Sequence, residues 1–313
     1  IEVLHLVVHE ELLDVAHHLE RELGREDAGV LALVFLQDVG LHRAAHGRQR
    51  PFADFRCLVL SRVAAVVSLE LGDLLVDRMD DYVQVLHAAV ALFQASEEVS
   101  RQEWHDYVQA LELDERMPGI LGTGFSLMLR PGERAAHEAA VRAQGFPEYA
   151  IRPPGDRPLL STILYLEPFT GDNLRAFGFD MFSEPVRQAA MQRAADTGRA
   201  ALSGMVTLVQ EGPEQGQPGF LIYTPIYRKG LVPTSVDERR AALLGFAYSP
   251  FRAQAVLAKV FEASNLDVEV EVFDGPPASG RLLFASAQAA RQARHMMVID
   301  AVVAGQPWTL RVR

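Results

Sequence analysis

Residues 159–227 read LLSTILYLEPFTGDNLRAFGFDMFSEPVRQAAMQRAADTGRAALSGMVTLVQEGPEQGQPGFLIYTPIY. An apolar run that ends at Glu167-Pro168 predicts a strand, and a second short strand is expected to end at residues 178–180. Two more strands are expected farther on, the last ending at residues 225–227. The stretch therefore predicts most of a sheet.

One helix is expected to lie across this sheet. Ser183 is a suitable N-cap, and Pro185 fits the first turn because it lacks an N–H that would need a partner. Gly198 can adopt the left-handed conformation that ends a helix. A sheet crossed by the helix of residues 183–198 has the size to enclose a small molecule.

A long helix is predicted before this stretch, because apolar residues recur there with heptad spacing. The residues of this stripe are Leu69, Val76, Met79, Val83, Leu86, Val90 and Phe93. The stripe predicts either the stalk of a homodimer or a helix packed along the core of its own domain. A second helix follows, with Ser100 and Glu103 spaced as a capping box.

Composition limits the class of protein. The chain has 313 residues, 49% of them hydrophobic, and a net charge of −11. A packed core is expected, and the negative charge disfavours nucleic acid as a partner. Cys57 is the one cysteine, so no disulfide forms within the chain. No apolar run reaches the ~18 residues of a membrane helix.

Residues 1–62 differ from the rest of the chain and form an atypical leader, either disordered or not native coding sequence. Six of the ten histidines lie in it: His5, His9, His17, His18, His42 and His46. An alternative interpretation is a metal-binding protein or an enzyme that uses these histidines. The spacing matches no recognised zinc pattern, so no metal site or cofactor is predicted.

Catalytic motifs are missing from the sequence: there is no phosphate-binding loop, no complete dinucleotide loop and no G-x-S-x-G turn. We therefore predict a pocket that recognises a ligand without reacting with it, and no enzyme activity. Glu167 ends a strand, where a buried carboxylate would need a partner, whereas Asp180 is expected to stabilise the following helix. The candidate ligand-binding residues are Tyr165, Glu167, Phe179, Ser203, Thr207, Tyr223 and Tyr227.

The last third of the chain predicts a second, smaller unit. A strand is expected at residues 242–248 and a helix at residues 251–263. Alternating valines at residues 268–272 and apolar runs at residues 281–285, 296–303 and 308–312 predict further strands. Residues 305–307 predict a hairpin turn between the last two. The fold class is therefore α+β.

An ordered set of short motifs resembles the CHASE sensory domain of bacterial sensor kinases, nucleotide cyclases and plant cytokinin receptors. The motifs lie between residues 80 and 263: Pro118-Gly119-Ile120, residues 165–168, Asn173, residues 178–180, Pro185 with Arg187, residues 194–198, residues 225–227, Arg239-Arg240 and Gly245. Each motif alone is common, and the order carries the resemblance.

The resemblance implies a long N-terminal helix followed by two PAS-like modules in tandem. On this basis residues 63–117 form a dimer stalk, residues 118–250 a distal ligand-binding module and residues 251–313 a proximal module. Glu167 falls near an acid that binds ligand in the plant receptors, and Ser203 near a ligand-facing threonine. The implied function is an extracytoplasmic, periplasmic sensor of a small ligand, normally flanked by membrane spans that this chain lacks. A free-standing soluble binding protein is the other alternative.

Overall fold

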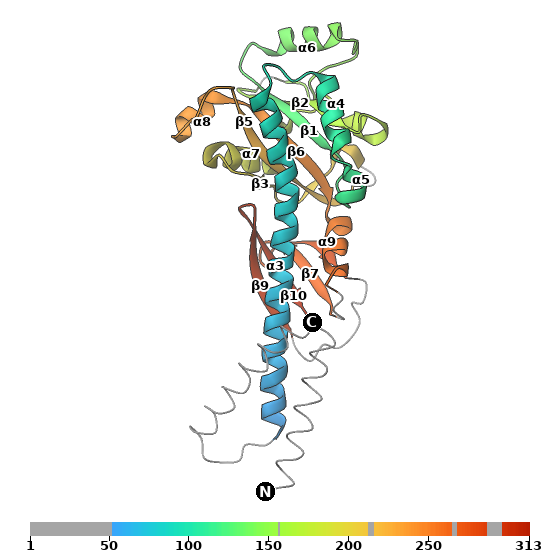
Figure 1. The fold of residues 1–313 in the computed structure, drawn as a ribbon, viewed down its shortest axis with the longest axis vertical. Helices are drawn as coiled ribbons and strands as arrows, with labels where there is room; N and C mark the ends of the chain where they lie inside the picture. The colour runs from blue at the N-terminus through green and yellow to red at the C-terminus, as the bar shows by residue number, and fades with distance from the viewer. Residues whose placement is uncertain (1–51, 156, 212–215, 265–267, 287–295) are drawn as a thin grey trace. The chain divides into compact units, whose positions relative to one another are not determined.

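The computed structural model describes residues 52–155, 157–211, 216–264, 268–286 and 296–313 (Figure 1). Residues 64–263 and 268–313 form one compact unit. Residues 1–51 of the expected leader, with its six histidines, lie outside the described residues. Residues 52–62 of that leader belong to the first turns of helix α3, Phe52–Ala95.

The larger of two sheets has six antiparallel strands. Strand order is β2-β1-β6-β5-β3, and β4 also pairs with β5. The strands are β1 Thr123–Leu129, β2 Leu160–Glu167, β3 Ala201–Leu202, β4 Val206–Thr207, β5 Pro218–Tyr227 and β6 Leu243–Arg252. The two ten-residue strands β5 and β6 pair along nearly their whole length, so they form the centre of the sheet.

The smaller sheet has four antiparallel strands in the order β8-β7-β10-β9. They are β7 Val270–Asp274, β8 Arg281–Ala285, β9 Met297–Val303 and β10 Gln306–Val312. The predicted hairpin is confirmed, because Val303 pairs with Gln306 across the turn. Two antiparallel sheets with helices confirm the α+β class.

Seven helices accompany the sheets within the described residues: α3, α4 Arg101–Ala110, α5 Leu113–Arg116, α6 Arg134–Ala143, α7 Pro185–Thr197, α8 Val236–Ala242 and α9 Ala253–Glu262. Three short 3-10 helices are η1 Gly171–Ala176, η2 Met181–Ser183 and η3 Val209–Glu211. The predicted capping box of α4 is confirmed: the Ser100 hydroxyl accepts from the Glu103 N–H, and the Glu103 carboxylate accepts from the Ser100 N–H.

Helix α7 begins one residue later than predicted. Ser183 ends the turn η2, and the N-cap is Glu184, whose carboxylate accepts from the backbone N–H groups of Val186 and Arg187. Glu184 is the N-cap because its carboxylate reaches the N–H groups of the first turn. The Ser183 hydroxyl instead donates to the carbonyl of Asp180. The predicted end is confirmed, with Gly198 at a φ of 71°.

One strand prediction was wrong. No strand ends at residues 178–180, because η1 takes up the preceding residues and leaves only single bridges from Phe179 and Asp180. The strand and the helix predicted at residues 242–248 and 251–263 are both present, but β6 continues to Arg252, so the helix α9 begins two residues later than predicted. Phe251 stays in the strand because its ring packs between Tyr82 of α3 and Phe220 of β5.

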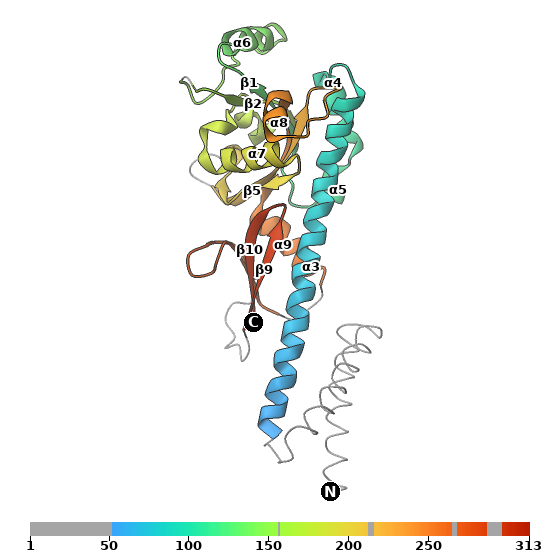
Figure 2. The same cartoon turned by 90° about the vertical axis from the view of Figure 1, so that its left-hand side faces the viewer.

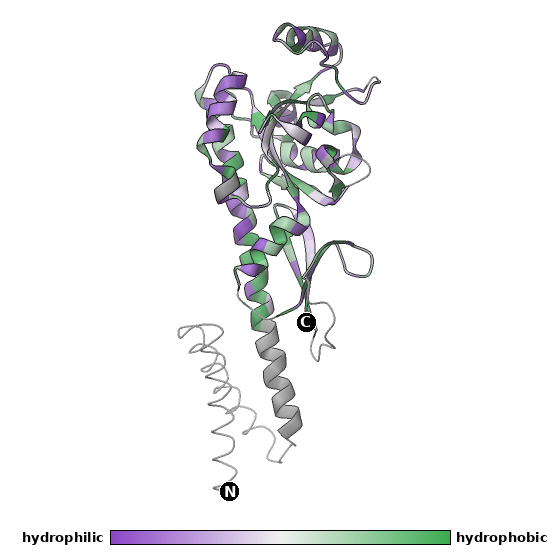
Figure 3. Ribbon diagram, turned by 90° about the vertical axis from the view of Figure 1, so that its right-hand side faces the viewer, coloured by the Kyte–Doolittle hydropathy of each residue, from purple (hydrophilic) through white to green (hydrophobic). Residues whose placement is uncertain are grey.

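The heptad stripe on α3 packs largely against its own chain. Met79, Val83 and Leu86 are buried within one copy, while Leu69 is 59% exposed. Helices α3 and α4 lie on one side of the large sheet and α7 on the other (Figure 2). Helix α3 carries both hydrophilic and hydrophobic residues along its described length (Figure 3), as a helix buried on one face must. Dimerisation through this stripe stays a prediction.

The two sheets contact each other through the β3–β4 connection. The Met205 N–H donates to the Asp274 carboxylate at 2.7 Å, and the Leu202 N–H donates to the Ala304 carbonyl at 3.0 Å. Phe220 of β5 and Trp308 of β10 add an aromatic contact, with ring centroids 5.2 Å apart. A movement of the β3–β4 connection would therefore displace the smaller sheet.

Asp180 provides a test of the local fold around η2. Its fully buried carboxylate accepts from Ser161 N at 2.8 Å, Phe182 N at 3.1 Å and Arg157 Nε at 2.6 Å. Asp180→Ala should lower the free energy of unfolding by about 3 kcal/mol, because it removes the carboxylate that pairs with the partly buried Arg157 and leaves two backbone N–H groups without a partner. The exposed Asp172→Ala is the control for urea denaturation, and equal effects of the two changes would contradict this role.

Glu271 provides a test of the smaller sheet. Hydrogen bonding and charge from Arg311, its direct cross-strand partner, hold the pKa of Glu271 below its usual value. A lowered folded pKa stabilises the protein above the unfolded pKa of about 4.3, and this stabilisation is lost as pH falls through the folded pKa. Glu271→Gln should therefore cost about 1 kcal/mol at pH 7, and this cost should shrink as pH falls below about 4.3 and vanish once pH is below the folded pKa. A pH-independent difference in urea denaturation would contradict it.

Candidate functional site

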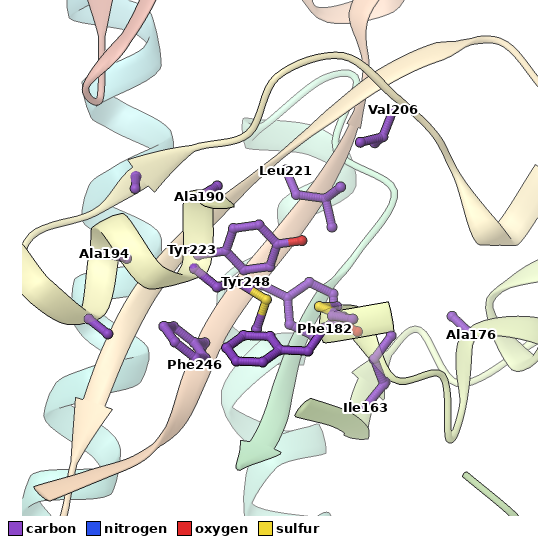
Figure 4. Close-up of a cluster of buried hydrophobic side chains, with 14 of the residues drawn as sticks. Ile163, Ala176, Phe182, Ala190, Ala194, Val206, Leu221, Tyr223, Phe246 and Tyr248 are labelled. Carbon is purple, nitrogen blue, oxygen red and sulfur yellow. The ribbon is translucent and has the colours of Figure 1, made fainter. Parts of the chain in front are cut away.

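An apolar cluster fills the space between α7 and the large sheet (Figure 4). Helix α7 turns Ala190, Met191 and Ala194 toward the sheet, at the spacing that places them on one helix face. We call this set the α7 cluster; its buried members are Ile163, Leu166, Ala176, Met181, Phe182, Ala190, Met191, Ala194, Ala195, Ala201, Val206, Leu208, Leu221, Tyr223, Phe246 and Tyr248.

Two tyrosines occupy the middle of the α7 cluster. Tyr223 and Tyr248 are directly opposite each other on β5 and β6, and the same row continues to Gly124 on β1. The glycine is required there, because a Cβ at position 124 would lie 2.5 Å from the Tyr248 ring. Small residues on either side of the two tyrosines in this row, Gly124 and Ala201, thus leave room for the two phenol rings.

Neither tyrosine hydroxyl makes a hydrogen bond of good geometry among the described residues, although the Arg187 side chain lies close enough to the Tyr223 hydroxyl to interact with it. Both side chains are fully buried, so the hydroxyls are also removed from bulk water. Burial raises the pKa of Tyr223 and of Tyr248 well above the usual value, and Arg187 offsets this in part. The phenols are therefore neutral at physiological pH and can donate hydrogen bonds.

Arg187 of α7 brings a positive charge to the edge of the α7 cluster. It is only 4% exposed, and its guanidinium lies 5.5 Å from the centre of the Phe179 ring. Its Nη2 donates to the Thr207 carbonyl at 2.8 Å, while its Nη1 is 3.7 Å from the Glu184 carboxylate. A buried cation with one short hydrogen bond and one long ion pair is incompletely compensated.

Three of the predicted ligand-binding residues meet at this place. Tyr223 is in the α7 cluster, Phe179 packs against it, and Thr207 contributes its carbonyl to Arg187 although its side chain is exposed. Ser203 serves the backbone, because its hydroxyl accepts from Leu221 N and donates to the Gly204 carbonyl. Tyr227 lies beyond the α7 cluster and donates to the Ala195 carbonyl near the end of α7.

Tyr165 and Glu167 lie on the opposite face of the sheet, toward α4. The Tyr165 hydroxyl donates to the Val99 carbonyl at 2.8 Å, and its ring stacks on Trp104. Glu167 is buried, accepts from Phe169 N at 3.1 Å, and lies 3.2 Å from His105 Nδ1. These two residues therefore do not share a space with Tyr223.

Sequence reasoning missed Tyr248 and Arg187 as site residues. Arg187 could have been identified from the sequence as a site residue, because it is the one charged residue on the α7 face that also carries Ala190, Met191 and Ala194. Tyr248 was harder to find. Its role depends on the strand pairing that sets it between Gly124 and Tyr223, which a single sequence does not reveal.

A second location of interest lies near α6. A surface hollow of about 450 Å³, wide open to solvent, is lined by residues 145–150 with Arg152, Leu174 and Phe177. Behind it, the Arg101 guanidinium sits among the rings of Phe146, Tyr165, Phe169 and Phe177, at 4.6–5.6 Å from their centres. The Arg101 Nη1 donates to the Leu164 carbonyl, so this cation holds the aromatic rings together.

The sequence profile of the CHASE domain matches residues 97–284, more than half of the chain. The chain belongs to the CHASE domain family. The matched range contains both faces of the large sheet, all of α7 and the start of the smaller sheet. CHASE domains are sensory domains, typically the extracellular part of signalling receptors.

A curated protein, the hybrid signal transduction histidine kinase A of Dictyostelium discoideum, is similar to this CHASE chain. The two are 28% identical over 130 residues, a match that covers 39% of the chain and 6% of the relative. The chain thus spans a small part of the length of this relative.

Two features of the described residues bear on the alternatives. None of the helices found there is long and apolar enough to cross a membrane. No group of three or more potential metal ligands occurs in the same part of the chain. The histidines on which the metal-binding alternative depends lie outside it, so that alternative is untested.

The unpartnered hydroxyls give an unusual stability prediction. Tyr223→Phe and Tyr248→Phe should each raise the free energy of unfolding by about 1 kcal/mol, because each removes a buried group that makes no hydrogen bond. Tyr165→Phe should lower it by about 1 kcal/mol, because this hydroxyl donates to a carbonyl. Urea denaturation of the three variants tests the contrast. A loss of stability for all three would mean that the buried hydroxyls do have partners.

Proposed function

We propose that this CHASE chain is the extracytoplasmic sensor portion of a bacterial transmembrane receptor and binds a small molecule in the α7 cluster. Family membership supports a sensory role, and the similar histidine kinase supports an attached signalling enzyme. In this proposal residues 118–250 are a distal, PAS-like ligand-binding module and residues 251–313 a proximal, PAS-like one. The output enzyme is a histidine kinase or a nucleotide cyclase, and the chain itself catalyses nothing.

The observation that carries the proposal is the set of unused polar groups within the α7 cluster. A buried hydroxyl without a partner costs about 1–3 kcal/mol, and this cluster has two. Purely structural residues at these positions would be more stable as phenylalanine. A ligand that accepts hydrogen bonds from Tyr223 and Tyr248 would remove this cost. The unliganded protein would therefore gain free energy by binding such a ligand.

Entry of a ligand requires the α7 cluster to open. Met181 and Met191 are both buried in it, and methionine adapts its shape because its side chain is unbranched and has three rotatable bonds. Three alanines of α7 face the cluster, so outward movement of α7 would displace one large apolar side chain of the helix, Met191, and would break the hydrogen bond from Arg187 to the Thr207 carbonyl.

Movement of α7 offers a route for the signal. Arg193 of α7 donates to the Leu202 carbonyl and to Gln306 of β10. The neighbouring connection joins Met205 to Asp274 of β7. A ligand that shifts α7 would thereby shift the smaller sheet, and with it the membrane-proximal end of the sensor. We propose that a homodimer passes this change on through α3, in which Leu69 is the exposed member of the heptad stripe.

The ligand site is tested by a thermal-shift screen of the full chain with small acids, amines and purines. At least one class should raise the Tm. The double variant Tyr223→Phe/Tyr248→Phe should bind that compound about tenfold more weakly by calorimetry, because two hydrogen bonds are lost. The matched control, Glu167→Ala on the opposite face, should leave the affinity unchanged.

Loss of binding in Glu167→Ala with no effect of the tyrosine changes would move the site to the α4 face. A screen in which no class of compound raises the Tm would contradict ligand sensing by this chain. Metal analysis of the same purified protein separates the metal-binding alternative, which requires stoichiometric metal.

A further inference from the structure

We propose that the ligand of the α7 cluster is a small carboxylate with an apolar body, held by Arg187 and the two buried tyrosines. This inference rests on the proposed function and adds to it the chemical class of the ligand. Its basis is an imbalance between hydrogen-bond donors and acceptors in and around the cluster.

The α7 cluster has more hydrogen bonds to donate than it uses. The neutral phenols Tyr223 and Tyr248 can each donate one hydrogen bond and make none of good geometry to the protein, although Arg187 lies beside the Tyr223 oxygen. Both lie in one cross-strand row, with ring centres 6.3 Å apart. Arg187 adds guanidinium N–H groups and can only donate. A ligand that satisfies these groups must therefore present acceptors.

The acceptors around these donors are already occupied. The two Glu184 carboxylate oxygens accept from Val186 N at 3.0 Å and Arg187 N at 2.9 Å, which fixes them at the start of α7. The Asp180 carboxylate is taken by Ser161, Phe182 and Arg157. Each Glu184 oxygen keeps a lone pair, but this carboxylate already lies 3.7 Å from Arg187, so an amine would compete with Arg187 for it.

The charge of Arg187 also favours a carboxylate as the ligand. Its guanidinium is buried, yet its nearest carboxylate is that of Glu184, 3.7 Å from Nη1. A carboxylate from the ligand would complete this ion pair, and arginine binds carboxylates through two parallel hydrogen bonds. The surrounding side chains, including Phe179, Phe246 and Met191, are apolar or aromatic. The body of the ligand should be apolar to match them.

The experiment uses three probes of one skeleton: phenylacetate, phenylacetamide and 2-phenylethylamine. They share the aromatic body and differ in charge. With the full chain, phenylacetate should raise the Tm most, phenylacetamide less and the amine not at all. Calorimetry should give the same order of affinity. This ranking uses the unaltered protein, so it does not depend on any variant folding.

Variants then identify the residue. Arg187→Gln should weaken phenylacetate binding about tenfold or more, the effect expected for a hydrogen bond to a charged group, and should abolish its advantage over phenylacetamide. Arg187→Lys, which keeps the charge, should retain part of that advantage. The control is Arg199→Gln just beyond the same helix, an exposed arginine outside the α7 cluster. It should leave the ranking unchanged.

Each failure has its own meaning. Equal or tighter binding of the amine, or an unchanged acid preference in Arg187→Gln, would overturn the carboxylate inference while leaving ligand sensing intact. Failure of all three probes and of the wider screen to raise the Tm would overturn both proposals.

Discussion

The six-stranded sheet is apolar on both faces, and both faces must be covered. Strand β5 is buried at every position from 219 to 226, so neither side of it meets solvent. A sheet of this kind cannot be stable with helices on one side only. Helices α3 and α4 cover one face and α7 covers the other. The position of the long helix, the site under α7 and the contact with the smaller sheet all follow from this requirement.

The same requirement makes the polar residues beneath α7 informative. Packing an apolar sheet against an alanine-rich helix requires no polar groups at the interface. Two phenol hydroxyls and a guanidinium nevertheless lie there. These groups lower stability unless something else binds them. The opposite face shows the contrast: the Tyr165 hydroxyl and the Glu167 carboxylate both have protein partners there. Buried donors without a partner occur on the α4 side too, at Trp104 Nε1 and Arg101 Nη2. What distinguishes the α7 side is that two such phenols are cross-strand neighbours and lie near a buried guanidinium.

Local sequence signals predicted local structure well. The capping box at Ser100, the glycine end of α7 at Gly198 and the hairpin at Gly305 all depend on neighbours in the chain, and all three were predicted. Predictions failed where distant contacts outweighed local preference. Phe251 stays in a strand because Tyr82 and Phe220 enclose its ring. Glu184 is the N-cap in place of Ser183, because the Ser183 hydroxyl donates to the Asp180 carbonyl in the preceding turn.

The sequence by itself determined the α+β class, the sensory family and the aromatic residues among which a site had to be sought, because these depend on periodicity and on ordered motifs. It could not assign Tyr165 and Tyr223 to opposite faces, or pair Tyr248 with Tyr223. A bulge between β1 and β2 and the register of three strands decide those questions. One residue of register moves every side chain to the other face of a sheet. Only the tertiary structure could therefore place Tyr223 and Tyr248 beneath α7, near its Arg187.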